Sequence, residues 1–195
     1  RAARKDEHLE LAVRLHGQER ASAFDDVAVV HHSLPGISAD QVDIGTTVLG
    51  SRWKVPFYIN AMTGGTQATA AINAHLAEAA ADAGVAIACG SVHVALHDPE
   101  RADGFRVIRR RAPGAFVLAN VGPTVSPQEA ARAVEMLEAD ALQIHLNAAQ
   151  ELVMPEGDRD FSGWEEAVAT IVAAVPVPVV VKEVGFGLSR RSIES

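Results

Sequence analysis

The sequence predicts an α/β protein in which strands and helices alternate around a parallel sheet. Five short apolar runs recur along the chain, and each is followed by polar residues or glycine: residues 56–62, 85–90, 115–121, 141–145 and 178–183. Runs that are apolar at nearly every position are typical of strands buried on both faces of a parallel sheet. Helical patterns fill the gaps between the runs, and this order implies right-handed βαβ units.

The helical segments carry recognisable patterns and start signals. Residues 67–83 are rich in alanine, with larger apolar side chains at helical spacing. Ser126, Pro127 and Glu129 form a typical helix start, with a cap residue, a proline in the first turn and a glutamate three residues after the cap. This helix is expected to run to about Glu138. Residues 162–175 repeat the pattern, and residues 105–111 form a shorter, weaker candidate.

About 55 residues precede the first strand of the predicted sheet. They contain a helical stretch at residues 6–15, a loop at residues 31–36 and a short hairpin strand within residues 42–49. Five strand–helix units then follow, whereas a closed (β/α)8 TIM barrel needs eight strands and about 250 residues. The pattern therefore leaves two alternatives, an open five-stranded α/β domain or a barrel whose C-terminal part is absent.

Composition and charge exclude several classes of function. The chain has 195 residues, 48% hydrophobic and 22% charged, with a formal net charge of −8. An acidic chain is a poor candidate for coating nucleic acid or an anionic membrane. The longest apolar run, residues 167–181, is too short and too interrupted by proline to span a bilayer. Cys89 is the single cysteine, which suits a reducing compartment, and we expect a cytoplasmic protein without a signal peptide.

Polar residues gather where the predicted strands end, which is where (β/α) barrels carry their active sites. They are Asn60, Ser91, Asn120, His145, Asn147 and Lys182. The alternative is that asparagine, serine and glycine are simply common in loops. A lysine at the end of an apolar strand must meet an anion or form an ion pair, here with Glu183 or another carboxylate. The segment Thr63–Thr66 lets backbone N–H groups approach a flat ring or an anion, because it contains two glycines.

The metal-binding signals are few. His93 and His97 are four residues apart, but no zinc motif surrounds them. Gln150 and Glu151 follow the fourth strand in what we expect to be a loop. A single carboxylate such as Glu151 beside amides suits Mg²⁺ shared with phosphate oxygens of a substrate.

These residues together resemble the type 2, FMN-dependent isopentenyl diphosphate isomerases. The resemblance extends from Arg4 to Ser189, and its most specific parts are an Arg-Lys-x-x-His start and a His-x-Asn-x-x-Gln-Glu motif. The matching stretches are residues 4–8, 61–65, 90–91, 119–120, 143–151 and 181–185. The resemblance implies a (β/α)8 TIM barrel of which about five β/α units are present. Residues 1–55 would be an N-terminal extension and substrate lid, and residues 56–195 the FMN-binding barrel without its C-terminal part.

The same resemblance implies a role for each site residue. The isoprenoid head would be surrounded by the catalytic residues His145, Asn147 and Gln150. FMN would contact Ala61, Met62, Thr63, Ser91, Asn120 and Lys182. The substrate diphosphate would be held by Arg4, Lys5, His8, Ser91, His93, Gln150 and Ser189, and Glu151 would bind Mg²⁺. NADPH would reduce the flavin, isopentenyl and dimethylallyl diphosphate would be the substrates, and the protein would form a homo-oligomer, a tetramer or octamer.

One departure from the family pattern is visible in the residues present. Many members have an arginine where this chain has His93, which supplies positive charge only when it is protonated. Two other functions remain open at this stage: another FMN-dependent barrel oxidoreductase of the 2-hydroxy acid oxidase kind, and a non-catalytic half-barrel fragment.

Overall fold

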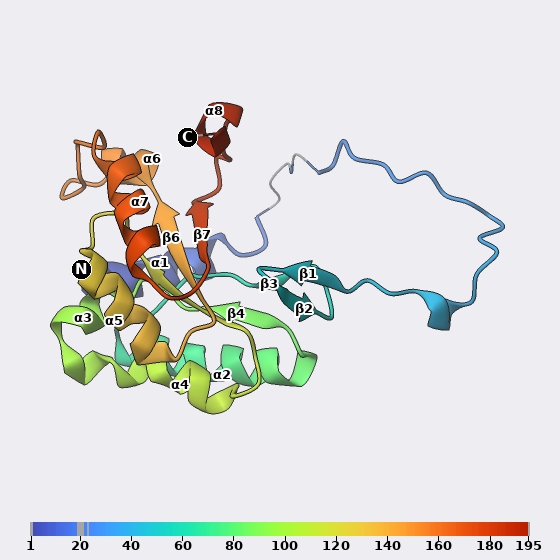
Figure 1. Ribbon diagram of the computed structural model, residues 1–195, viewed down its shortest axis with the longest axis horizontal. Coiled ribbons are helices and arrows are strands. Elements are labelled where there is room, and N and C mark those ends of the chain that lie inside the picture. Colours follow the sequence, from blue (N-terminus) through green and yellow to red (C-terminus); the bar gives the residue numbers. More distant parts are fainter. Residues whose placement is uncertain (1, 19–21, 23, 195) are drawn as a thin grey trace.

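A curled parallel sheet forms the centre of the structure, a computed structural model that describes residues 2–18, 22 and 24–194. Its strands lie side by side in chain order and are all parallel: β3 (Tyr58–Ile59), β4 (Ala86–Ala88), β5 (Val117–Val121), β6 (Ala141–Leu146) and β7 (Val179–Glu183). Figure 1 shows the curl of this sheet. The predicted α/β architecture with a parallel five-stranded sheet is confirmed.

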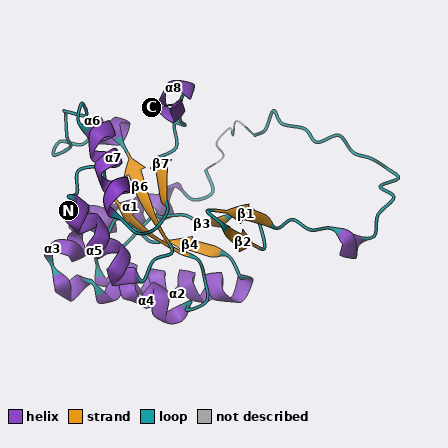
Figure 2. Ribbon diagram, viewed as in Figure 1, coloured by secondary structure: helices purple, strands orange, loops and turns teal. Residues whose placement is uncertain are grey.

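Four helices cover the outer face of the sheet, as Figure 2 shows. They are α2 (Gln67–Ala83), α4 (Asp103–Arg111), α5 (Pro127–Leu137) and α7 (Trp164–Ala174). The capping box predicted for α5 is present, because the Ser126 hydroxyl accepts from the Glu129 N–H while the Glu129 carboxylate accepts from the Ser126 N–H. Helix α2 ends at Gly84, whose φ of 66° is the left-handed conformation that glycine adopts without strain.

The main core lies between the strands and these helices, and strand alternation decides which residues enter it. In β6, Leu142 and Ile144 belong to this core, whereas Ala141 belongs to a smaller cluster with Ala88 and Leu118. Successive side chains of a strand point to opposite faces. Gln143 and His145 therefore share the concave face with Ala141, away from the helices.

The N-terminal region precedes the sheet and reaches away from it. Helix α1 (Ala2–Leu15) is longer than the predicted stretch of residues 6–15, and the expected hairpin is present as β1 (Thr46–Val48) and β2 (Ser51–Trp53). Residues 24–45 form a largely extended segment with one 3₁₀ turn, η1 (Ala39–Gln41), that projects from the body before β1 (Figure 1). Helix α1 is tied to the start of α2, because the Thr66 hydroxyl donates to the Asp6 carboxylate at 2.7 Å.

Short helices follow the carboxyl ends of the strands. They are α3 (His93–His97), the 3₁₀ turn η2 (Pro99–Arg101), α6 (Ala148–Val153) and α8 (Arg190–Glu194). The expectation that Gln150 and Glu151 lie in a loop is wrong, because both belong to α6, which starts one residue after Asn147. A six-residue helix is too short to produce a readable apolar period.

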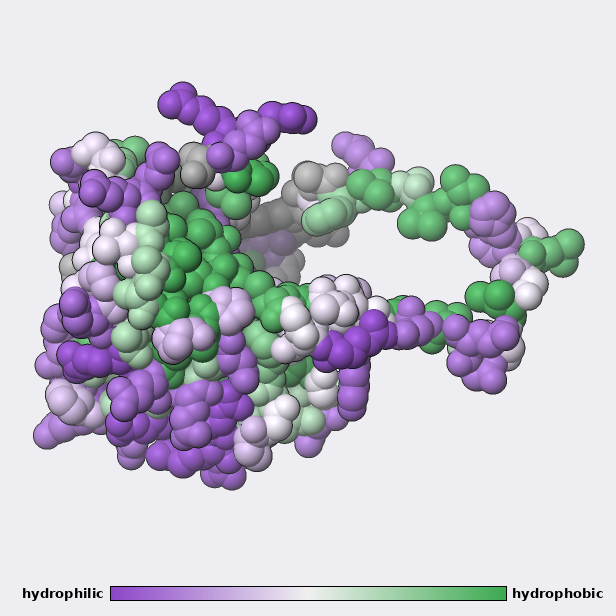
Figure 3. Space-filling view, in the orientation of Figure 1, coloured by the Kyte–Doolittle hydropathy of each residue, from purple (hydrophilic) through white to green (hydrophobic). Residues whose placement is uncertain are grey.

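The outer edge of β7 is apolar and open. Val181 and Val184 are exposed, and Figure 3 shows apolar surface over this part of the molecule. Within the described residues, no helix is both long and apolar enough to cross a membrane.

Candidate functional site

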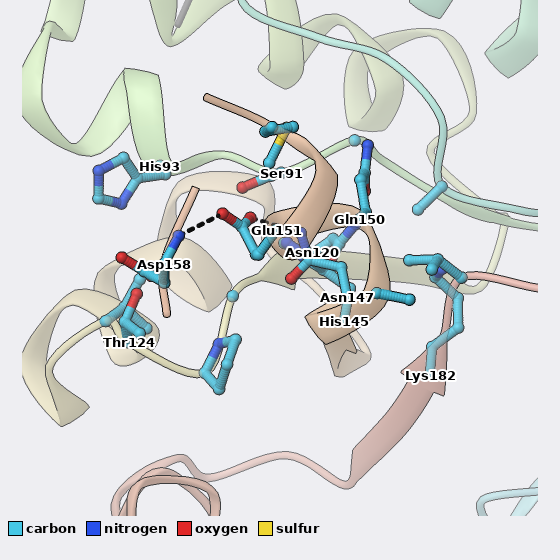
Figure 4. A pocket seen from close by; sticks show the side chains of 18 of the residues that line it. Ser91, His93, Asn120, Thr124, His145, Asn147, Gln150, Glu151, Asp158 and Lys182 are labelled. Carbon is cyan, nitrogen blue, oxygen red and sulfur yellow. Dashed lines mark hydrogen bonds between the residues drawn. The ribbon is translucent and has the colours of Figure 1, made fainter. Parts of the chain in front are cut away.

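A cleft of about 600 Å³ opens at the carboxyl ends of the parallel strands. Its volume falls within the range of ligand sites in proteins, about 300–1,000 Å³. Ten of the residues predicted from the sequence line it: Ala61, Met62, Ser91, His93, Asn120, His145, Asn147, Gln150, Glu151 and Lys182. Figure 4 shows that the side chains of Asn120, His145 and Lys182 gather at the strand ends, beside Gln150 and Glu151 of α6.

Three polar side chains form a row on the floor of the cleft. The sheet register pairs Asn120 with Gln143 and His145 with Lys182, so these residues belong to adjacent strands. The Asn120 amide oxygen lies 3.0 Å from His145 Nδ1, an arrangement in which the imidazole donates from Nδ1. Asn120 is buried, which fixes its amide against the histidine. The floor therefore offers a flat ligand both neutral polar groups and one cation.

Lys182 supplies that cation at the end of β7. Burial lowers the pKa of its ammonium group, and the neighbouring Glu183 carboxylate opposes this shift. The ammonium donates to the Glu183 backbone oxygen at 3.0 Å. Burial makes the charged form of this ammonium less favourable than it is in water. A bound anion would raise the pKa again and stabilise the charged form, so the site favours an anionic ligand.

The Glu183 carboxylate is engaged by the loop that follows β7. It accepts from the backbone N–H groups of Gly185, Phe186 and Gly187. Burial raises the pKa of Glu183, but these backbone hydrogen bonds outweigh burial and hold the pKa below its usual value. Glu183 thus orders its own loop. Its carboxylate still attracts the Lys182 ammonium electrostatically, but the ammonium itself donates to the Glu183 backbone oxygen.

Glycines bring two backbone segments together beneath the cleft. The Gly90 N–H donates to the Thr63 oxygen at 3.0 Å, and a Cβ at Gly90 would lie 2.2 Å from that oxygen. At Gly64, which has a φ of 158°, a Cβ would lie 2.1 Å from the Phe105 ring. The chain after β3 therefore descends onto the end of β4 at a distance that only glycine permits, and this leaves room above for a flat ligand.

A carboxylate from α6 also lines the cleft. Glu151 Oε1 accepts from the Asn147 amide at 2.6 Å, and Oε2 accepts from the Asp158 N–H at 3.1 Å. Asn147 is buried. The structure thus gives Asn147 a contact that the sequence reading did not include, since its amide orients Glu151.

The donor set around Glu151 fits Mg²⁺ only as a shared ion. Among the described residues, no three histidine, cysteine or acidic side chains are close enough together to enclose a metal. Mg²⁺ is commonly held by one or two carboxylates, waters and substrate phosphate oxygens. A single oriented carboxylate that faces a cleft suits that mode and does not suit a closed protein cage.

His93 lies at the rim of the cleft on α3. Its ring meets the His97 ring edge to face, with centroids 4.6 Å apart, and His97 Nε2 lies 3.3 Å from the Glu129 carboxylate. The Ser126 N–H and hydroxyl, followed by the two histidines, lower the pKa of Glu129. The two histidines, four residues apart in the sequence, therefore lie on one face of α3.

Some predicted site residues lie elsewhere. Thr63 is outside the lining of the cleft, and its hydroxyl is buried without a hydrogen-bond partner. Ser189 is exposed at the start of α8, where its hydroxyl lies 3.0 Å from that of Ser192. The side chains of Arg4, Lys5 and His8 lie outside the described residues.

The sequence reading missed a buried residue of the concave face and the turn after α6. Gln143 donates to the Tyr58 hydroxyl at 3.1 Å and lies close to Asn60, which links β6 to β3 on the concave face. Its signal was a polar residue in the middle of an apolar strand. The turn at residues 154–159 packs on Glu151. The charged run Glu-Gly-Asp-Arg at residues 156–159 was the sequence feature that could have indicated it.

Comparison with known proteins places this site in a family context. Residues 14–103 match the family model described as FMN-dependent dehydrogenase. The chain is 54% identical to the isopentenyl-diphosphate delta-isomerase of Kitasatospora griseola, over 98% of this chain and 53% of that protein. It is 50% identical to the protein of the same name from Streptomyces sp. (strain CL190), over 98% of this chain and 53% of that protein. It is also 50% identical to the protein of that name from Latilactobacillus sakei, over 97% of this chain and 54% of that protein. The chain spans about half the length of the curated relatives it matches.

The chain is similar, first, to the FMN-dependent dehydrogenases over residues 14–103, and it folds as a parallel α/β sheet. More particularly, the chain is a homologue of the isopentenyl-diphosphate delta-isomerases, related to them over nearly its whole length. The resemblance predicted from the sequence motifs is thereby confirmed.

Proposed function

We propose that this protein interconverts isopentenyl diphosphate and dimethylallyl diphosphate with reduced FMN bound in the cleft. The observation that supports this proposal best is that two unlike groups of side chains line one cleft. One group is the row of Asn120, His145 and Lys182, and the other is Gln150 with the oriented carboxylate of Glu151. A flavin ring suits the first group, and a metal-bound diphosphate suits the second.

The fold part of the proposal is that the curled sheet belongs to a (β/α)8 TIM barrel. In such barrels the active site lies at the carboxyl ends of the strands, and the cleft of this chain has that position. Residues 56–195 would then supply the flavin side of the site, and residues 1–55 the extension that carries the basic lid. The bond between Thr66 and Asp6 supports this, because it holds α1 beside Gly65 at the rim of the cleft.

Each proposed role of a residue follows from its chemistry. Reduced FMN, when bound, supplies the acid–base group that moves a proton between substrate carbons. Lys182 would stabilise negative charge on the flavin ring, with Asn120 and Ser91 as polar partners and Ala61 and Met62 as packing surface. The reaction has no net redox change, so NADPH would be needed to reduce the flavin but not to sustain turnover.

The substrate side of the site has to orient the diphosphate and keep the head group dry. Glu151 would hold Mg²⁺ against the diphosphate oxygens, with Asn147 fixing its carboxylate. Gln150 cannot serve as a strong base, because a neutral amide does not titrate near pH 7. Its role would be to orient the isoprenoid head. His145 would contact the same head group from the floor. Exclusion of water matters because positive charge develops on carbon during proton transfer.

The diphosphate end of the substrate would meet the cationic residues. Arg4, Lys5 and His8 would close over it, and Ser91, His93 and Ser189 would add partners. His93 would contribute positive charge only in its protonated form. A homo-oligomeric state and a cytoplasmic location are further expectations from the family resemblance.

A second candidate is an FMN-dependent oxidoreductase, which the description of the matching family model favours. The two functions differ in how they use reductant, because an oxidoreductase transfers a pair of electrons in every cycle. The isomerase proposal expects dimethylallyl diphosphate to accumulate from isopentenyl diphosphate under anaerobic conditions after a single reduction of the flavin. NADPH consumed in step with product would instead support the oxidoreductase.

The Glu151→Gln variant tests the metal assignment within this function. The amide keeps the shape of the side chain but loses its charge, so we expect weaker substrate binding and loss of the Mg²⁺ dependence, with FMN affinity retained. Glu165→Gln is the matched control, because Glu165 is exposed at the start of α7 and does not line the cleft. Unchanged Mg²⁺-dependent turnover in Glu151→Gln would remove Glu151 from the metal site.

A further inference from the structure

The turn after α6 folds back on that helix and is held there by one arginine. Arg159 Nη1 donates to the backbone oxygens of Glu151 at 2.6 Å, Gly157 at 2.8 Å and Asp158 at 3.0 Å. Its Nη2 donates to the oxygen of Met154, the residue that ends the helix, at 2.7 Å. The guanidinium therefore satisfies carbonyl groups at the C-terminus of α6, where the helix dipole also favours a cation.

Gly157 brings the turn into direct contact with the helix. A Cβ at this position would lie 2.0 Å from the Glu151 backbone oxygen and 2.7 Å from its carbonyl carbon. Real side chains do not approach a backbone so closely, so a substituted residue would push the turn away from α6. The turn and the helix are thus fitted to each other at the residue that carries the cleft carboxylate.

This packing delivers a backbone donor to the carboxylate of Glu151. The next residue after Gly157 is Asp158, and its N–H donates to Glu151 Oε2 at 3.1 Å. The Asn147 amide holds Oε1 at 2.6 Å from the other side. One donor on each oxygen fixes both the position and the plane of the carboxylate, and one of the two donors depends on the turn.

We propose that Arg159 is a positioning residue that, through this turn, sets the geometry with which Glu151 meets a divalent cation. The proposal rests on the function proposed above for Glu151. Arg159 itself would contact neither metal nor substrate, since its guanidinium donates to four backbone oxygens. Groups that orient a metal ligand typically change metal affinity about 10–100-fold when they are removed.

Lysine does not replace arginine in this role. A planar guanidinium carries five N–H donors in a fixed fork, whereas an ammonium group is a compact charge on a flexible stem. Because the carbonyls belong to four different residues, we expect Arg159→Lys to resemble Arg159→Ala more than the wild type. Gly157→Ala tests the same turn by displacing it without removing a charge.

The test measures metal binding directly in the FMN-loaded protein. Mn²⁺ serves as the probe, with inorganic pyrophosphate present, and free Mn²⁺ is followed by electron paramagnetic resonance. We expect the half-saturating Mn²⁺ concentration to rise about tenfold or more in Arg159→Ala, Arg159→Lys and Gly157→Ala. FMN affinity should stay near the wild-type value. Arg106→Ala is the matched control. Arg106 belongs to α4, outside this turn, and its guanidinium lies 3.7 Å from the Asp103 carboxylate in an exposed ion pair.

The outcomes separate a positioning role from a merely structural one. Wild-type Mn²⁺ affinity in Arg159→Ala and Gly157→Ala would overturn the proposal, as would a parallel loss of Mn²⁺ and FMN affinity. If Arg159→Ala does not fold, Arg159→Lys and Gly157→Ala carry the test. A wild-type protein that binds Mn²⁺ in this way but does not isomerise its substrate would refute the proposed function and leave the role of Arg159 standing.

Discussion

A methyl group added at Gly90 has no room in this structure, and its consequences reach both stability and the cleft. The Cβ of Gly90→Ala would lie 2.2 Å from the Thr63 oxygen and 2.4 Å from the Thr63 carbonyl carbon. These are backbone atoms, so relief requires the segment after β3 to separate from the end of β4. The hydrogen bond from the Gly90 N–H to Thr63 would be lost in that movement.

The expected cost follows from these two contributions. Overpacking in a well-packed site costs about 1–3 kcal/mol, and a lost hydrogen bond about 1 kcal/mol. The total of about 2–4 kcal/mol corresponds to a fall of roughly 4–16 °C in Tm for a chain of this size. Gly90 also lines the cleft, so if about 1.4 kcal/mol of this cost reaches the bound state, FMN affinity falls about tenfold.

The assay pairs thermal unfolding with a flavin fluorescence titration. Gly114→Ala is the matched control, because Gly114 is exposed and a Cβ there would meet nothing within 4 Å. We expect the control to keep the wild-type Tm and FMN affinity. Equal values for Gly90→Ala and Gly114→Ala would refute the claim that the close approach beneath the cleft is required.

Two further predictions concern the charged groups around the cleft. Burial lowers the pKa of Lys182, so its charge destabilises the folded protein at neutral pH. The free energy of unfolding should therefore rise as pH increases through that pKa, while FMN affinity falls over the same range. Lys182→Gln should abolish both trends in titrations from neutral to alkaline pH. Deleting residues 1–8 should raise the substrate KM about tenfold or more while FMN affinity stays unchanged, because charge-assisted contacts to a diphosphate are each worth about 1.5–3 kcal/mol. Asp6→Ala, which removes the contact that holds α1 to Thr66, should raise the KM less than the deletion does, and an equal loss of FMN affinity on deletion would contradict the lid.

The elements that the sequence predicted best are those whose apolar pattern had a single interpretation. The runs at residues 115–121 and 141–145 became β5 and β6, which lie in the middle of the sheet with a neighbour on each side. The run at residues 56–62 gave only the two-residue strand β3. That strand is at the edge and pairs only with β4 among the described strands, and the chain leaves the ladder after Ile59.

The candidate site was predictable as a set of residues but not as a set of contacts. Chain order places Asn120, His145 and Lys182 at the ends of strands, and parallel strands bring their carboxyl ends together. Nothing in the spacing indicated that Asn147 would turn its amide to Glu151, because that contact depends on a helix beginning at once after β6. Arg159 was missed for a related reason, since it acts on backbone oxygens that no side-chain motif reports.

The two faces of the same strand connect stability to chemistry. Along β6, Leu142 and Ile144 fill the core against the helices, while Gln143 and His145 face the cleft side of the sheet. A shift of one residue in register would exchange the two sets and bury the imidazole among apolar side chains. The packing of Ile144 therefore specifies the register that places His145 beside Asn120 and Lys182. The apolar core and the polar floor are consequences of one alternation, so a core substitution that loosens β6 will also disorder the site.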